Sequence, residues 1–172
     1  MHVLREIQIS DAKWIFDACQ DSEIQYWTTV PRPYLIEHAQ SFANGEFPEY
    51  KIWVIENIEN GIGAPVGVIS IHTVDHDGVA EIGYWIAPWG RGHGASADAI
   101  ELVAQYAQDD PKIRSLQACI SDLNTASQKA ARAAGLQPAG CASKNCPAGE
   151  AQTRATNYRR ELSVSGGHLR GL

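Results

Sequence analysis

The sequence has no long hydrophobic run and no excess of positive charge. No apolar stretch approaches the roughly 20 residues that a membrane-spanning helix needs, and the opening MHVLREIQIS lacks the apolar core of a signal peptide. We therefore expect a cytoplasmic protein without a membrane partner. Lys and Arg total 14 against 20 Asp and Glu, a formal net charge of −6. This balance argues against nucleic acid as a partner, because phosphate backbones attract basic surfaces.

Metal-binding and common nucleotide-binding signatures are missing as well. The chain has neither the G-x-x-x-x-G-K-[S/T] loop nor the G-x-G-x-x-G fingerprint. Its four cysteines form no C-x-x-C motif: Cys19, Cys119, Cys141 and Cys146. Cys141 and Cys146 lack a second ligand pair at a suitable spacing, so we expect free thiols and no metal.

The length and composition suit one globular domain. The 172 residues are 44% hydrophobic and 20% charged, which is ordinary for a domain with a sizeable core. We assign residues 1–165 to a single domain. Residues 166–172 are rich in glycine and are expected to form a flexible C-terminal tail.

The apolar pattern predicts a mixed α/β chain in the order β-α-α-β-β-β-α-β-α-β-β. Strands are predicted at residues 3–9, 50–56, 66–74, 79–87 and 113–121, with two more within 136–164. Helices are predicted at residues 12–19, 34–44, a long segment through 100–107, and 125–134. Ser10 should cap the first helix, residues 21–23 should end it, and residues 26–33 should form a loop. The second helix should bury Leu35, Ala39 and Phe42.

The spacing of these elements also predicts how the strands pair. Short turns rich in Gly, Asn and Asp join the strands at 50–56, 66–74 and 79–87, which indicates an antiparallel meander. The strand-helix-strand passage from 79 to 121 indicates a parallel pair. Alternation along residues 81–86 should place Glu81, Gly83 and Trp85 on one face of the sheet, and the residues between them on the other.

The loop at residues 91–96 joins the predicted strand at 79–87 to the long helix. The first turn of a helix has N–H groups without internal partners and carries the positive end of the helix dipole. Gly92 and Gly94 would let an anion approach the main chain, and Arg91 offers a guanidinium suited to phosphate. The loop is therefore either an anion site or a turn that needs glycine for its geometry.

Three segments carry a resemblance to a known family. Arg91-Gly92-His93-Gly94-Ala95-Ser96 resembles the [Q/R]-x-x-G-x-[G/A] acyl-CoA pyrophosphate loop of the GNAT acetyltransferases, with the small Ser96 as a departure. The preceding EIGYWIAP is similar to the strand that carries this loop in the RimJ/RimL branch. The opening VLREIQISDAKWIFDACQDSEIQYWTTVPRPY and the segment at 124–136, an N-x-x-S…G-[F/L] pattern, also resemble that branch. The last thirty residues match it poorly.

The resemblance implies a GNAT fold and an acetyl-CoA-dependent N-acetyltransferase without a metal. The acetyl group would pass directly to a primary amine, which is a protein N-terminus or a small molecule such as a polyamine, amino acid or antibiotic. A non-catalytic acyl-CoA-binding module is the alternative from another class. The sequence leaves open whether the chain forms a homodimer.

The resemblance also implies roles for individual residues around acetyl-CoA. The residues expected to bind it are Trp85, Ile86, Ala87, Arg91, Gly92, His93, Gly94, Ala95, Ser96, Asn124 and Ser127. Asn124 would contact the pantetheine arm, and Ser127 would protonate the thiolate leaving group. Both residues also suit a plain helix N-terminus, with Asn124 as the cap.

The acceptor side is less well defined by the sequence. An attacking amine must lose a proton, so a base or a water chain is needed. Glu81, at the start of the strand that leads into the loop, is the first candidate base, and Glu150 is the second. His72 could face the acceptor cleft or be an ordinary strand residue. Trp27 and Tyr34 flank a proline-containing loop and are expected to line the acceptor pocket.

Overall fold

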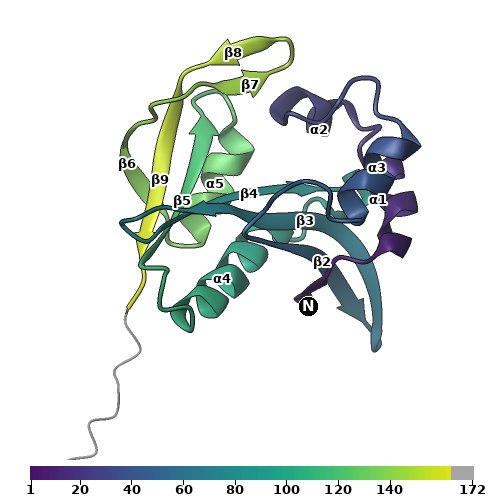
Figure 1. Ribbon diagram of the computed structural model, residues 1–172, viewed down its shortest axis with the longest axis horizontal. Coiled ribbons are helices and arrows are strands. Elements are labelled where there is room, and N and C mark those ends of the chain that lie inside the picture. The colour runs from purple at the N-terminus through teal and green to yellow at the C-terminus, as the bar shows by residue number, and fades with distance from the viewer. Residues whose placement is uncertain (164–172) are drawn as a thin grey trace, which may run out of the picture.

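The computed structural model describes residues 1–163, which form a mixed sheet with helices on both faces (Figure 1). The predicted tail at 166–172 and the domain end at 165 lie outside the described residues. The N-terminal part contains β1 (His2–Glu6), η1 (Ile9–Asp11), α1 (Ala12–Ala18), α2 (Ser22–Trp27), α3 (Ile36–Ala43), β2 (Lys51–Glu59) and β3 (Ile62–Val74). The central part contains β4 (Val79–Ile86), η2 (Pro88–Gly90), α4 (Ala95–Gln108), β5 (Ser115–Ser121) and α5 (Thr125–Ala133). The last part contains β6 (Gln137–Cys141), β7 (Cys146–Ala148), β8 (Ala151–Thr153) and β9 (Ala155–Glu161).

The large sheet has seven strands in the order β1-β2-β3-β4-β5-β9-β6. β4 and β5 are parallel and the other neighbours are antiparallel, so the predicted meander and the predicted parallel pair are both confirmed. Residues 79–82 of β4 pair with residues 115–118 of β5, and the paired register stops there. The carboxyl-terminal half of β4 therefore has β3 on one side and an opening on the other.

Helices cover the two faces of the sheet and enclose separate cores. α4 and α5 lie on one face, where Ile100, Val103 and Leu116 are fully buried. Burying each of these large side chains contributes about 1.5–3 kcal/mol. α1 and α3 lie on the opposite face around Ile15 and Ala39, and Figure 1 shows α4 across the sheet from them. No helix within residues 1–163 is long and apolar enough to cross a bilayer.

The start of the chain differs from its prediction. β1 ends at Glu6 instead of continuing to residue 9, and Ser10 does not cap α1. Asp11 organises this turn instead, because its buried carboxylate accepts hydrogen bonds from the Gln8 N–H at 2.7 Å and the Trp14 Nε1–H at 2.7 Å. It also accepts two hydrogen bonds from the Arg5 guanidinium, at 2.7 and 2.8 Å.

The region after α1 contains a helix that was not predicted. Asp21 does not simply end α1: its carboxylate accepts the Ile24 N–H at 3.0 Å and so caps α2. α3 begins at Ile36, later than expected, and turns Ala39 and Ala43 inward. Leu35 precedes it and is 46% exposed, so its predicted burial was wrong. Phe42 is partly buried, as part of the same packing.

The C-terminal part holds more strands than the two expected. β6 and β9 join the large sheet, and β7 and β8 form a separate hairpin. The hairpin is attached to its surroundings by short polar contacts. The Gly149 N–H donates to the Tyr26 carbonyl of α2 at 2.7 Å, and the Ser121 and Thr153 hydroxyls are 2.6 Å apart. The free thiols of Cys119 and Cys146 are 3.2 Å apart.

Candidate functional site

The loop between β4 and α4 presents main-chain N–H groups. Gly92 and Gly94 have φ of +82° and +74°, in the left-handed region that favours glycine, and a Cβ at either would meet nothing within 4 Å. Gly94 is the N-cap of α4 and has no side chain to cap it. Within residues 1–163, the N–H groups of residues 92–96 have no hydrogen-bond acceptor. The loop is therefore an open cluster of donors at the positive end of a 14-residue helix.

The Arg91 side chain is engaged elsewhere. Its guanidinium bonds Asp21 at 2.5 and 3.3 Å and lies 3.7 Å from Glu23. The hydrogen bond from Arg91, together with the N–H of Ile24, holds the pKa of Asp21 below its usual range. Arg91 thus fastens α2 to the loop, and a bound anion would meet the main chain of the loop first. His93 is exposed, Ser96 is half-buried, and Ala95 is buried and offers its main chain alone.

The opening beside β4 exposes alternate main-chain groups. The Ala87 N–H donates to the Val66 carbonyl at 2.8 Å, and hydrogen-bonded pairs alternate along an antiparallel ladder. Trp85 and Ala87 therefore bond to β3, whereas the N–H and C=O groups of Tyr84 and Ile86 point toward the side that β5 has left. The Trp85 ring packs on Trp14, with 5.7 Å between ring centroids. Of the three strand residues expected to bind acetyl-CoA, Ile86 directs its main chain into the opening.

Two hydroxyl groups meet across this opening. Asn124 caps α5 as predicted, with its side chain accepting the Ser127 N–H at 3.2 Å. The Ser127 hydroxyl lies 2.8 Å from the Tyr84 hydroxyl, and either can be the donor. Burial raises the pKa of Tyr84 to about 12, so its phenol stays protonated at neutral pH. Sequence reasoning gave Tyr84 no catalytic role, although its alternation with Ile82 places it on the face that carries α5.

The opposite face of the sheet carries Glu81. This face also carries Trp85, so the predicted alternation along β4 is confirmed by the packing of its two sides. Glu81 is 23% exposed and accepts a hydrogen bond from Lys144 at 2.5 Å. That bond raises the pKa of Lys144. Lys144 comes from the segment before β7 and has no motif in the sequence. Glu150 is exposed at the β7–β8 turn.

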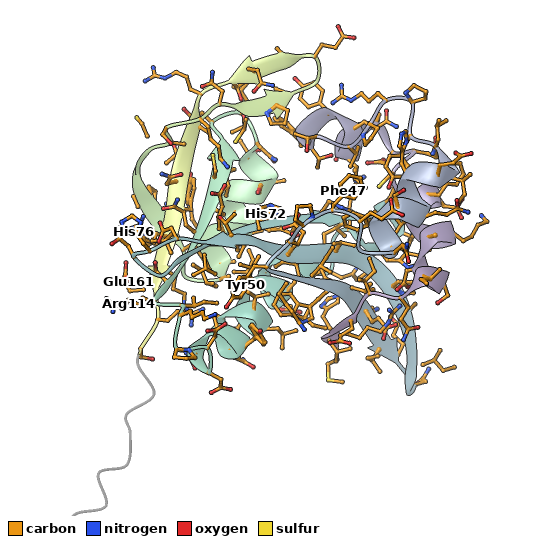
Figure 2. The ribbon with its side chains drawn as sticks, viewed as in Figure 1. Phe47, Tyr50, His72, His76, Arg114 and Glu161 are labelled. Atoms are coloured by element: carbon orange, nitrogen blue, oxygen red, sulfur yellow. The ribbon has the colours of Figure 1, made fainter. Side chains whose placement is uncertain are left out.

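The three residues expected around the acceptor lie in different environments. His72 is on β3, on the Glu81 face, with its Nδ1 2.7 Å from the Glu49 carboxylate; Figure 2 marks its position over the sheet. Trp27 ends α2 and packs edge-on against Tyr26 at 4.6 Å. Tyr34 is 5% exposed and belongs to the core under α1 and α3. Its side chain therefore stabilises that core and presents little surface to an acceptor.

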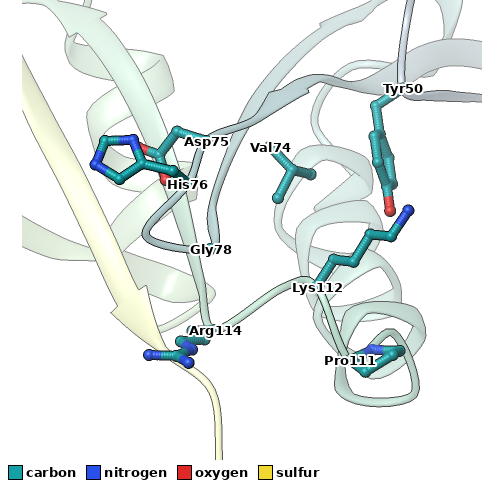
Figure 3. A pocket seen from close by; sticks show the side chains of 8 residues that line it. All are labelled: Tyr50, Val74, Asp75, His76, Gly78, Pro111, Lys112 and Arg114. Carbon is teal, nitrogen blue, oxygen red and sulfur yellow. The ribbon is translucent and has the colours of Figure 1, made fainter.

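A separate hollow of about 440 Å³ lies at the other end of β4. Figure 3 shows its lining, which consists of Tyr50, Val74, Asp75, His76, Gly78, Pro111, Lys112 and Arg114. These residues belong to the β3–β4 turn, the α4–β5 connection and the start of β2. The hollow is thus distinct from the donor loop, which follows the carboxyl end of β4.

Comparison with known proteins places this arrangement in a family. The model of the acetyltransferase (GNAT) domain matches residues 2–137. The microcin C7 self-immunity acetyltransferase MccE, solved with acetyl-CoA and AMP, has a TM-score of 0.80 at 19% identity, covering 94% of this chain and 92% of that one. RimL, the ribosomal L7/L12 alpha-N-protein acetyltransferase, solved with coenzyme A, has a TM-score of 0.80 at 17% identity, covering 95% and 96%.

A third structure and the curated proteins complete the comparison. The aminoglycoside acetyltransferase AAC(6')-Ib, solved with coenzyme A and kanamycin, has a TM-score of 0.74 at 16% identity, covering 94% of this chain and 95% of that one. No curated protein matches the sequence significantly. At these identities the solved structures establish the fold, and the domain model covers most of the chain. The chain therefore belongs to the GNAT acetyltransferase family.

Proposed function

We propose that this chain is an acetyl-CoA-dependent N-acetyltransferase of the RimJ/RimL type, which transfers an acetyl group directly to a primary amine. The observation that carries the proposal is the open donor loop at the start of α4, next to the opening between β4 and β5. Family membership supports it, as do solved relatives that bind acetyl-CoA or coenzyme A.

The residues present fit acetyl-CoA. The N–H groups of residues 92–96 would bind its pyrophosphate, because the two glycines leave the approach free of side chains. The unpaired edge of β4 would bind the peptide-like pantetheine arm as an added strand does, through the groups of Tyr84 and Ile86 that face the opening. Asn124 at the start of α5 would contact the same arm. Bound in this way, acetyl-CoA would supply a thioester carbon for attack.

Each chemical need of the transfer has a candidate group. Main-chain N–H groups of β4 that face the opening would stabilise negative charge on the carbonyl oxygen. The Ser127 and Tyr84 hydroxyls, which lie 2.8 Å apart, would supply a proton to the leaving sulfur. The amine would approach from the opposite face, where Glu81 is the predicted base. Holding both substrates at the opening would itself lower the barrier by several kcal/mol, about 7 or more in well-oriented cases.

The acceptor is proposed by class. RimL is named for acetylating a ribosomal protein N-terminus and AAC(6')-Ib for acting on aminoglycosides, so both peptide and small-molecule amines are candidates here. The acceptor side would include Trp27 of α2 and the β7–β8 hairpin. The helix and the hairpin are joined by the hydrogen bond from the Gly149 N–H to the Tyr26 carbonyl.

The test combines cofactor binding with turnover. Calorimetry with acetyl-CoA should show saturable binding at one site. Thiol release should then be followed with a panel of N-terminal peptides, polyamines, amino acids and aminoglycosides. Acetyl-CoA binding without transfer to any amine would favour the acyl-CoA-binding module over the enzyme. Absence of binding would refute the proposal.

A further inference from the structure

His72 sits at an irregularity in the sheet. The register between β3 and β4 pairs Ile71 with Ile82 and then Thr73 with Glu81, so two steps on β3 match one step on β4. His72 is the extra residue of this β-bulge. Bulges re-aim side chains and are frequent next to active sites. Ile71 faces the core beneath α4, so the next residue, His72, faces the opposite side of the sheet. Thr73 faces that same side, because it pairs with Glu81 after the bulge.

The imidazole of His72 lies across β4. A Cβ built on Gly83 would come within 2.2 Å of His72 Nε2, so the ring occupies the space that any side chain at position 83 would need. Gly83 is the first residue of β4 after the paired register with β5 ends. The Nε2 atom is thus held at the beginning of the opening, on the face that carries Glu81 and from which the amine is proposed to approach.

A carboxylate fixes the orientation of this ring. Nδ1 is 2.7 Å from Glu49, whose side chain is 21% exposed, and 3.4 Å from the Ser70 hydroxyl. A carboxylate at Nδ1 favours the tautomer with the proton on Nδ1, which leaves the Nε2 lone pair free. Within the described residues 1–163, Nε2 has no hydrogen-bond partner. Glu81 of β4 and Lys144, from the segment before β7, also meet on this face and bind each other.

We propose that His72, oriented by Glu49, is the base that accepts the proton of the attacking amine, in place of Glu81. As the bond from nitrogen to the acetyl carbon forms, Nε2 takes the amine proton and Glu49 stabilises the resulting imidazolium. The carbon–sulfur bond breaks on the other face, where the Tyr84–Ser127 pair gives a proton to the sulfur. Exchange with solvent then removes the proton from the imidazolium and returns one to the hydroxyl pair. Glu81 is less suited to this role because its carboxylate already accepts from the Lys144 ammonium. This inference rests on the proposed acetyl transfer.

The kinetic test compares four forms of the full chain: wild type, His72→Gln, Glu81→Gln and the matched control His76→Gln. His76 is on the β3–β4 turn, and its side chain is 90% exposed. His72→Gln should lower kcat/KM by about 10²-fold or more and flatten the acidic limb of the pH–rate profile, with calorimetric affinity for acetyl-CoA unchanged. Glu81→Gln should keep the acidic limb, and His76→Gln should match wild type. A wild-type profile in His72→Gln, or a lost limb in Glu81→Gln, would overturn the assignment.

A second readout does not need the acceptor. Long-range proton–nitrogen NMR of the wild-type chain with acetyl-CoA should show the neutral His72 ring protonated at Nδ1, and Glu49→Gln should redistribute the proton between the nitrogens. A ring protonated at Nε2 would refute the inference even if the enzyme is active. Failure of the proposed function is recognised separately, because wild type would then fail to bind acetyl-CoA or to release thiol with any amine.

Discussion

Replacing Gly94 with valine should separate the cost to folding from the cost to cofactor binding. Gly94 has φ of +74°, and placing an L side chain in that region costs about 1–2 kcal/mol per residue. For a domain of this size, each kcal/mol lowers Tm by roughly 2–4 °C. The new side chain would occupy the open space beside Gly94, which the phosphates are proposed to enter. If two hydrogen bonds to phosphate are lost at about 1.5 kcal/mol each, affinity for acetyl-CoA should fall on the order of 100-fold.

Gly61 provides the matched control for this experiment. It has φ of +76°, a Cβ there would also meet nothing within 4 Å, and it lies in the β2–β3 turn. Gly61→Val should therefore lose a similar amount of thermal stability while binding acetyl-CoA as wild type does. Both variants are measured by thermal denaturation and by calorimetry. If Gly94→Val and Gly61→Val bind acetyl-CoA with affinities within about threefold, less than 1 kcal/mol apart, the loop is not the pyrophosphate site.

Two further predictions concern the Tyr84–Ser127 hydroxyl pair and the Arg91–Asp21 ion pair that holds α2 to the loop. Ser127→Ala should reduce kcat on the order of 10²-fold while acetyl-CoA affinity is retained. Its thermal stability should be nearly unchanged, because the Tyr84 hydroxyl still donates to the main-chain carbonyl of residue 127 at 3.2 Å. Full kcat at saturating substrates would mean that solvent protonates the thiolate. The folded pKa of Asp21 is lowered from 3.8 by Arg91 and the Ile24 N–H, so the stability it contributes is present at neutral pH and lost as pH falls through its folded pKa. As pH falls from about 5 to that pKa, the free energy of unfolding, measured by denaturant titration, should therefore decrease more for wild type than for Asp21→Asn. An equal decrease in both proteins would show that the Arg91–Asp21 pair contributes nothing to stability.

Local patterns in the sequence were sufficient for most of the fold and for the donor loop. Ile100, Val103, Ala104 and Ala107 recur at helical spacing because one face of α4 is buried. Such a pattern can be read from residues that are close in the sequence. The strand-helix-strand spacing was sufficient to predict the parallel pairing of β4 and β5. Asp21 shows the limit of such reasoning, because the same residue type can end one helix or cap the next, and the outcome depends on which N–H its carboxylate reaches.

The polar partners at the site could not be predicted because they come from distant parts of the chain. Arg91 and Asp21 are 70 positions apart, Lys144 and Glu81 are 63 apart, and Tyr84 and Ser127 are 43 apart. No periodicity connects such pairs, since each contact exists only after the sheet has brought the elements together. Family resemblance gave a role to Ser127, but it did not reveal the tyrosine beside it.

The β7–β8 hairpin has a consequence for how this enzyme can change its acceptor. Its hydrogen bonds and thiol contact described above reach Tyr26, Ser121 and Cys119, and none of them involves α4 or residues 91–96. The hairpin also pairs with itself rather than with the large sheet. On the proposed function, substitutions in residues 146–153 can therefore accumulate without removing a described contact of residues 91–96, so evolution, or an engineer grafting a hairpin from a relative, can vary the amine while the acyl donor stays the same.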